Sequence, residues 1–162
     1  GIIQTSIDTG AFESFILADG MIGDSLIEAI GPDLNGTIGT LPGSDSQEAA
    51  DFVTLAQDAG LTGDCPFCGE SYDGAALIAL AMQAAGSTDR AAIQSKIMDV
   101  ANAPGEAIGP GELARGLEIL AGGGEIDYVG ATGVELTDVG ETYGSYKELE
   151  VTDGEFVTVQ IH

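Results

Sequence analysis

The stretch that decides the fold is Phe15–Ser25, FILADGMIGDS. Its apolar run ends abruptly at Asp19-Gly20, which predicts a short buried strand followed by a turn. The segment Ser25–Ile30 then continues as a short helix. Asp and Gly favour tight turns, but the end of a strand in an α/β sheet is also where such folds bind ligands. Spacing alone leaves both interpretations of Asp19 and Gly20 open.

Outward from this stretch, helical and strand-like patterns alternate along the chain. Helical periodicity, with Gly or Pro near the ends, predicts helices over Ile2–Thr9, Gln47–Ala59, Ser71–Ala85, Arg90–Ala101 and 110–121. Strand-like runs occur at Gly36–Ser44 and, after Glu125, in IDYVG, GVELT, GSYKELEVT and EFVTVQI. Asp153-Gly154 is typical of a hairpin turn between the last two runs. This mixture of strands and helices indicates an α/β protein.

Length and composition indicate a globular chain. Its 162 residues are enough for a domain with a real core, and a hydrophobic content of 44% argues against intrinsic disorder. No apolar run approaches the ~20 residues needed to span a bilayer, so we expect no direct membrane insertion. Because the chain begins at Gly1 without a leader, we expect a mature or trimmed piece that cannot report its own targeting signal.

The charge is strongly acidic and excludes two classes of partner. The chain has 27 acidic residues against four Lys and Arg, a formal net charge of −23. Such a surface repels the phosphate backbone of nucleic acids and the surface of anionic membranes. Since the acids are spread over the whole chain, we interpret them as a solvated surface suited to saline surroundings, where salt screens self-repulsion.

Three blocks together resemble a known family. GAFESFILADGM, ESYDGAALIALAMQAAGSTDRAAIQSKIMDVAN and IDYVGATGVELTDVGETYGSYKELEVTDGEFVTV follow in the order found in the C-terminal half of ABC-importer substrate-binding proteins of the branched-chain amino-acid type. These proteins have the type I periplasmic binding fold. The blocks SYDGAALIALAMQAAGSTD and YVGATG are the more specific parts. The likeness covers nearly the whole chain and includes no catalytic signature.

The resemblance implies a two-lobed α/β fold with three crossings, in which the lobes close on a small-molecule ligand of the amino-acid or amide class. It assigns residues 1–42 to part of the second lobe, 43–140 to the first, and 141–162 to the crossing back. It further implies an ABC permease as partner, a periplasmic or extracytoplasmic location, no cofactor and no enzymatic activity.

The resemblance also implies binding roles for three residues. Asp19 matches the acid that meets the ligand's ammonium group, and Gly20 would let the backbone approach the ligand. Tyr72 matches an aromatic residue that faces the ligand from the start of the long helix. The residues themselves leave alternatives open: Tyr72 as a core tyrosine, and its neighbours Glu70, Ser71 and Asp73 as helix caps.

CPFC, Cys65–Cys68, has no counterpart in the family. A C-x-x-C pair is typical of redox motifs or of half a zinc site. Zinc lacks ligands here, since the remaining candidate, His162, is the last residue, so we expect a local disulfide in an oxidising compartment. Two other functions remain as alternatives, namely a thiol/disulfide-active domain that uses Cys65 and Cys68, and a ligand-sensing regulatory domain of the same fold.

Overall fold

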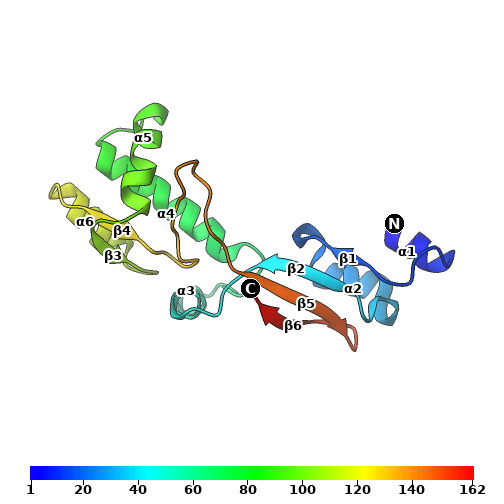
Figure 1. The fold of residues 1–162 in the computed structure, drawn as a ribbon. Helices are drawn as coiled ribbons and strands as arrows, with labels where there is room; N and C mark the ends of the chain where they lie inside the picture. Colours follow the sequence, from blue (N-terminus) through cyan, green and yellow to red (C-terminus); the bar gives the residue numbers. More distant parts are fainter. The chain divides into compact units, whose positions relative to one another are not determined.

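The computed structural model describes all residues from Gly1 to His162. It contains two compact units, drawn in Figure 1 in colours that follow the sequence. Unit 1 comprises Gly1–Ser44 and Ser145–His162, and unit 2 comprises Asp45–Gly144. Unit 1 is therefore built from both ends of the chain, and unit 2 from one continuous stretch.

Unit 1 is organised around a four-stranded sheet in the order β1-β2-β5-β6. The strands are β1 (Ile16–Leu17), β2 (Ile38–Pro42), β5 (Tyr146–Thr152) and β6 (Glu155–Ile161). β1 and β2 are parallel, and the other neighbouring pairs are antiparallel. The sheet is thus mixed, and only its β1–β2 part has the parallel pairing of an α/β fold.

Two helices and two 3-10 turns accompany this sheet: α1 (Ile2–Asp8), η1 (Asp19–Met21), α2 (Asp24–Ile30) and η2 (Gly31–Leu34). Their apolar side chains pack with the sheet in one core, whose buried members are Ile3, Leu17, Leu34 and Val151. Burial of these side chains from both chain ends is the main stabilising term of the unit, at about 1.5–3 kcal/mol for each large apolar residue.

The β5–β6 hairpin confirms the alternation that the sequence predicts. Leu149 and Val151 are buried, whereas Glu150 between them is exposed. Asp153 and Gly154 both have positive φ, 53° and 79°, as a two-residue type I′ turn requires. The turn is fastened to the rest of the unit because Gly154 N–H donates to Asn35 Oδ1 at 3.1 Å.

Unit 2 has four helices: α3 (Gln47–Asp58), α4 (Cys68–Ala85), α5 (Arg90–Ala101) and α6 (Leu113–Ala121). α4 is the longest, and it packs against both α5 and α6 (Figure 1). Side chains cap α3 and α5: Ser46 accepts from Ala49 N–H, and Asp89 accepts from the N–H groups of Ala91 and Ala92. The predicted helices are confirmed, although α4 begins before the predicted Ser71 and α6 begins at Leu113, after the predicted start at 110.

A parallel two-stranded sheet, β3 (Glu106–Ile108) and β4 (Ile126–Tyr128), completes unit 2. α4, α5, α6 and this sheet enclose the larger core. Its buried members are Ala76, Leu80, Ala81, Val100, Ala101, Ile108, Ile126, Tyr128 and Val134. α6 approaches α4 closely at Gly116, where an added Cβ would lie 2.9 Å from Leu80 Cδ2. A larger residue at this contact would force the Leu80 side chain to move.

The prediction of a strand at GVELT, residues 133–137, is wrong. This segment forms only an isolated bridge between Leu136 and Thr142. The side chain of Asn102 bonds the backbone of Leu136 instead: Nδ2 donates to the carbonyl at 2.8 Å, and Oδ1 accepts from the N–H at 2.9 Å. Because a side chain satisfies both backbone groups, Leu136 needs no strand partner.

Candidate functional site

Tyr72 lies on α4 beside the carboxyl ends of β3 and β4. Its ring packs on Phe52, with centroids 5.2 Å apart and planes at 46°. Its hydroxyl oxygen accepts from Gly111 N–H at 2.9 Å, and Gly111 belongs to the loop that follows β3. The side chain is only half-buried, and its O–H donates to no group of the protein. Tyr72 is thus held in place while its hydroxyl proton remains available to a ligand.

Asp73, the next residue, is a buried acid with no cationic partner. It is 3% exposed, and its carboxylate accepts four hydrogen bonds. Oδ1 accepts from Tyr128 O–H and Ala131 N–H, both at 2.8 Å. Oδ2 accepts from Thr132 N–H at 2.9 Å and from Thr132 Oγ1–H at 2.7 Å. Four donors compensate the buried charge, and they fix the loop after β4 against α4.

The residues around Asp73 are shaped to this role. Burial, and then the negative charge of Asp73, raise the pKa of the Tyr128 hydroxyl, which therefore stays protonated as a donor. Gly130 has φ +59°, and a Cβ there would collide with the Asp73 carboxylate and the Tyr128 ring. The SYDG and YVGATG blocks thus lie against each other. Tyr128, Ala131 and Thr132 of the second block form a cradle of donors around the Asp73 carboxylate of the first.

Sequence analysis missed this cradle because it considered Asp73, Glu70 and Ser71 as helix caps. The structure places the N-cap of α4 at Phe67, which has φ +62° and makes no side-chain cap bond. The available signal was an acid inside a helix that is apolar almost all round, which demands several donors from elsewhere in the chain.

Asp19 and Gly20 lie in η1, directly after the carboxyl end of β1. Both are exposed, and Asp19 Oδ1 accepts from Gly20 N–H at 2.6 Å. Gly20 does not have a positive φ, and a Cβ there would meet nothing within 4 Å. The fold therefore does not require glycine at position 20. One carboxylate oxygen of Asp19 thus accepts a bond within the turn, and the residue as a whole is exposed.

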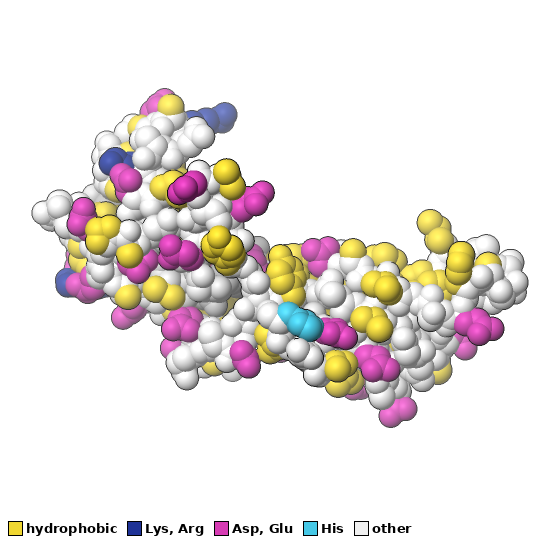
Figure 2. Space-filling view, viewed as in Figure 1, with side chains coloured by type: hydrophobic (Ala, Val, Ile, Leu, Met, Phe, Trp, Pro, Cys, Tyr) yellow, Lys and Arg dark blue, Asp and Glu magenta, His cyan; other side chains and the backbone are white.

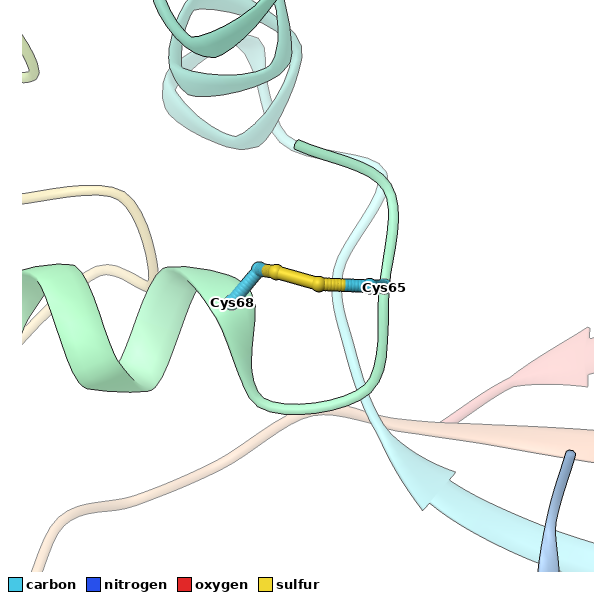
Figure 3. Close-up of a disulfide and its surroundings, with 2 residues drawn as sticks. All are labelled: Cys65 and Cys68. Atoms are coloured by element: carbon cyan, nitrogen blue, oxygen red, sulfur yellow. A yellow bond between two sulfur atoms is a disulfide. The ribbon is translucent and has the colours of Figure 1, made fainter. Parts of the chain in front are cut away.

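Cys65 and Cys68 form a disulfide, which joins the loop before α4 to the first residue of that helix (Figure 3). Cys65 is exposed, whereas Cys68 packs beside Tyr72 against the small core of Phe52, Ala56 and Ala131. No strand lies between α3 and α4, so the surroundings differ from those of a strand-borne redox motif. A closed loop this short stabilises the folded state by about 2 kcal/mol on the chain-entropy account.

The surface carries the predicted acidic excess, and Figure 2 shows Asp and Glu side chains spread over the visible face with few Lys and Arg. Arg115 makes a bidentate pair with Glu106, at 2.8 and 2.9 Å. The hydrogen bond from Arg115 lowers the pKa of Glu106. No three His, Cys, Asp or Glu side chains converge as metal ligands would. No helix combines the length and apolar character that a membrane crossing needs.

The candidate residues thus form separate groups. The structure brings Tyr72, Cys68 and Phe52 together in unit 2, with Cys65 joined through the disulfide. Asp19 and Gly20 are neighbours in unit 1. Tyr72 in unit 2 and Asp19 and Gly20 in unit 1 lie at the carboxyl ends of parallel strands, the edge where open α/β sheets bind their ligands.

Comparisons with known proteins assign this fold to a class. The chain is similar in structure to the leucine-binding protein LivK of Thermotoga maritima, with a TM-score of 0.67 and 20% sequence identity. The match covers 99% of this chain and 40% of LivK. The chain therefore has part of the two-lobed fold of branched-chain amino-acid-type substrate-binding proteins, as the resemblance in sequence indicates.

The chain is also similar in sequence to a protein that is named a substrate-binding protein. The chain is 31% identical over 97 residues to BasB, the substrate-binding protein of a chemotactic signal transduction system in Halobacterium salinarum. This match covers 59% of the chain and 24% of BasB. No protein-family profile matches the sequence. The chain spans less than half the length of either protein, and both are named as binding proteins rather than enzymes.

Proposed function

We propose that this chain is part of the solute-binding component of an ABC uptake system, which binds an amino acid or a related small polar metabolite. The observation that carries the proposal is Tyr72, an aromatic side chain fixed at the carboxyl edge of β3 and β4 with its hydroxyl proton unused. The likeness to two substrate-binding proteins supports it. The proposed protein is not an enzyme and acts outside the cytoplasmic membrane.

Each candidate residue has a role in this proposal. The Asp19 carboxylate receives an ammonium or amide group of the ligand, and Gly20 allows close approach of the backbone. Tyr72 contributes its ring face and its O–H. The lobe assignment is proposed as well, with 1–42 and 141–162 serving the second lobe and 43–140 the first. Ligand contacts with both lobes would favour the closed form, which the ABC permease recognises.

The comparison with BasB favours a second candidate function. BasB is named for chemotactic signal transduction, so a protein similar in sequence to this chain serves a sensory system. The ligand chemistry at Asp19 and Tyr72 is the same in both cases, and the partner differs. Co-purification of the ligand-loaded protein from its own cells with a permease supports uptake, and co-purification with a signal transducer supports sensing.

A ligand screen tests the proposed function. The whole protein is screened by thermal shift against leucine, the other amino acids, amides and short organic acids. At about 100 times Kd, a ligand adds roughly 2.7 kcal/mol of stability, which shifts the melting temperature by several degrees. If no compound in the panel shifts it, the proposed ligand class is wrong.

Matched variants then test the assigned residues by calorimetry with the strongest hit. Asp19→Asn is expected to weaken binding about tenfold or more, because it removes a charge-assisted hydrogen bond. Asp33→Asn, an exposed acid in the same unit, is its control. Tyr72→Phe is expected to weaken binding by several-fold, with the 79% exposed Tyr143→Phe as control. If a variant and its control bound the ligand equally well, the changed residue would not be a ligand contact: Asp19 would be a turn residue only, and Tyr72 a core residue only.

A further inference from the structure

The Cys65–Cys68 disulfide lies one helical turn from Tyr72. Tyr72 lies four positions after Cys68 on α4, and side chains at this spacing lie on the same face of a helix. Both pack against the same small core of Phe52, Ala56 and Ala131. A movement of the first turn of α4 would therefore be transmitted directly to the Tyr72 ring.

The backbone before α4 needs an external constraint. Phe67, the N-cap, has φ +62°, a conformation that bulky residues rarely adopt. It makes no side-chain cap bond, and the residue is 38% exposed. No side-chain cap holds this position. The chain around Phe67 is instead closed by the Cys65–Cys68 link and by the bond from Cys68 N–H to Cys65 O at 3.1 Å, while the Asp73 bonds hold the next turn of α4.

The preceding loop is itself anchored to α3. Leu61 N–H donates to Ala56 O at 2.9 Å. Gly63 is buried with φ +72°, and a Cβ there would lie 2.8 Å from Ala56 Cβ. The disulfide therefore connects a loop fixed on α3 to the first turn of α4, and the Tyr72–Phe52 ring contact lies between these two helices.

We propose that the Cys65–Cys68 disulfide is a positioning element for the candidate ligand contact Tyr72. It holds the start of α4 so that the Tyr72 hydroxyl meets Gly111 N–H and presents its own proton to the ligand. The importance of this role for binding rests on the proposed function. The positioning itself is a property of unit 2, and it can be measured without a ligand.

The ligand-free test is the exchange rate of the Gly111 amide, measured by NMR on the protein with and without the phosphine TCEP. TCEP supplies the two electrons that break the S–S bond; water supplies the protons and the oxygen, leaving two thiols and the phosphine oxide. Reduction is expected to raise the Gly111 exchange rate about tenfold, towards the rate in Tyr72→Phe, which lacks the accepting hydroxyl. The Val129 amide, which donates to Ile108 O, is expected to keep its rate.

Three results would overturn the proposal. The first is a Gly111 amide exchange rate that does not change on reduction. The second is a rise in both the Gly111 and the Val129 rates, which would indicate general destabilisation. The third is a Gly111 rate that is the same in Tyr72→Phe as in the unmodified protein, which would show that the hydroxyl does not protect this amide. The double variant Cys65→Ser/Cys68→Ala is the control for TCEP: it is expected to show the faster Gly111 rate and no response to the reagent.

A ligand arm uses leucine as the probe. If the oxidised protein binds leucine, reduction is expected to weaken the binding three- to tenfold while Tyr72→Phe removes most of this sensitivity. An equal loss on reduction in both proteins would overturn the link between the disulfide and Tyr72. Absence of leucine binding counts against leucine as the ligand in the proposed function, and the Gly111 exchange rate then decides the positioning proposal.

Discussion

Replacement of Asp73 by Asn is the sharpest test of the cradle described above. The two side chains have nearly the same shape, so the change removes the charge and converts one accepting oxygen into a donating NH2 group. The other side chains of the cradle are untouched. Any loss of stability therefore reports on the hydrogen bonds rather than on packing.

The expected magnitude follows from the four donors around the carboxylate. On the Oδ1 side, Tyr128 O–H can rotate to accept from the new NH2 group, but Ala131 N–H cannot. On the Oδ2 side, the Thr132 hydroxyl can rotate, but Thr132 N–H cannot. In either orientation of the amide, one backbone N–H faces another donor, at a cost of about 1–3 kcal/mol. The bonds that remain lose their charge assistance, so we expect a total of about 3 kcal/mol.

Urea unfolding followed by circular dichroism measures this loss, and a thermal scan should show a lower melting temperature by on the order of 10 °C. The control is Asp138→Asn, which makes the same chemical change at an exposed position of unit 2 and should stay within about 0.5 kcal/mol of the parent. A loss below about 1 kcal/mol in Asp73→Asn would refute the account of Asp73 as an acceptor for four buried donors.

Three further predictions concern the glycines of the cradle, the Arg115 ion pair and salt. Gly130→Ala should destabilise the protein by about 2–4 kcal/mol in urea titrations, against about 1 kcal/mol for Gly133→Ala, since both have positive φ but only Gly130 abuts the Asp73 carboxylate; equal losses would contradict this contact. Arg115→Gln should raise the carboxyl pKa of Glu106 in an NMR titration, because the bond from Arg115 is what lowers this pKa. The pair's contribution to folding stability is present above the pKa that Glu106 has in the unfolded chain, and it is lost as pH falls through the lowered pKa of the folded protein. If the Glu106 pKa were the same in Arg115→Gln as in the parent, a group other than Arg115 would be lowering it. The melting temperature should rise between about 0.1 and 1 M NaCl as the Debye length falls from about 10 to 3 Å around a chain of net charge −23, and should rise less in a variant whose exposed acids are changed to amides.

Local features of the fold could be predicted from the sequence because their causes are local. The bounds of α5 follow from the Asp89 cap and from the periodicity of the residues after it. The inward side chains of β5 follow from the alternation of Leu149 and Val151 with Glu150. Each of these patterns is complete within a few residues of the chain, so a single sequence is sufficient to recognise it.

Features that depend on distant residues could not be predicted. The bond between Asp73 and Tyr128 joins residues 55 positions apart, and neither residue indicates its partner. The role of Asn102 at Leu136 was missed for the same reason, and the predicted strand at GVELT was wrong as a consequence. The family resemblance brought Tyr72 to notice, but the Gly111 bond that fixes its hydroxyl is visible only in the structure.

The way the chain builds unit 1 has a consequence for the order of folding. β2 pairs with β5, although the whole of unit 2 lies between these strands in the sequence. Gly43 N–H donates to Ser145 O at the point where the chain leaves and re-enters unit 1. During synthesis, β1 and β2 therefore emerge long before their antiparallel partners exist, whereas unit 2 emerges complete. Closing so long a loop is slow unless the intervening chain is already compact. Unit 2 is thus expected to fold first, and its folding brings β5 close to β2 so that the sheet of unit 1 can be completed.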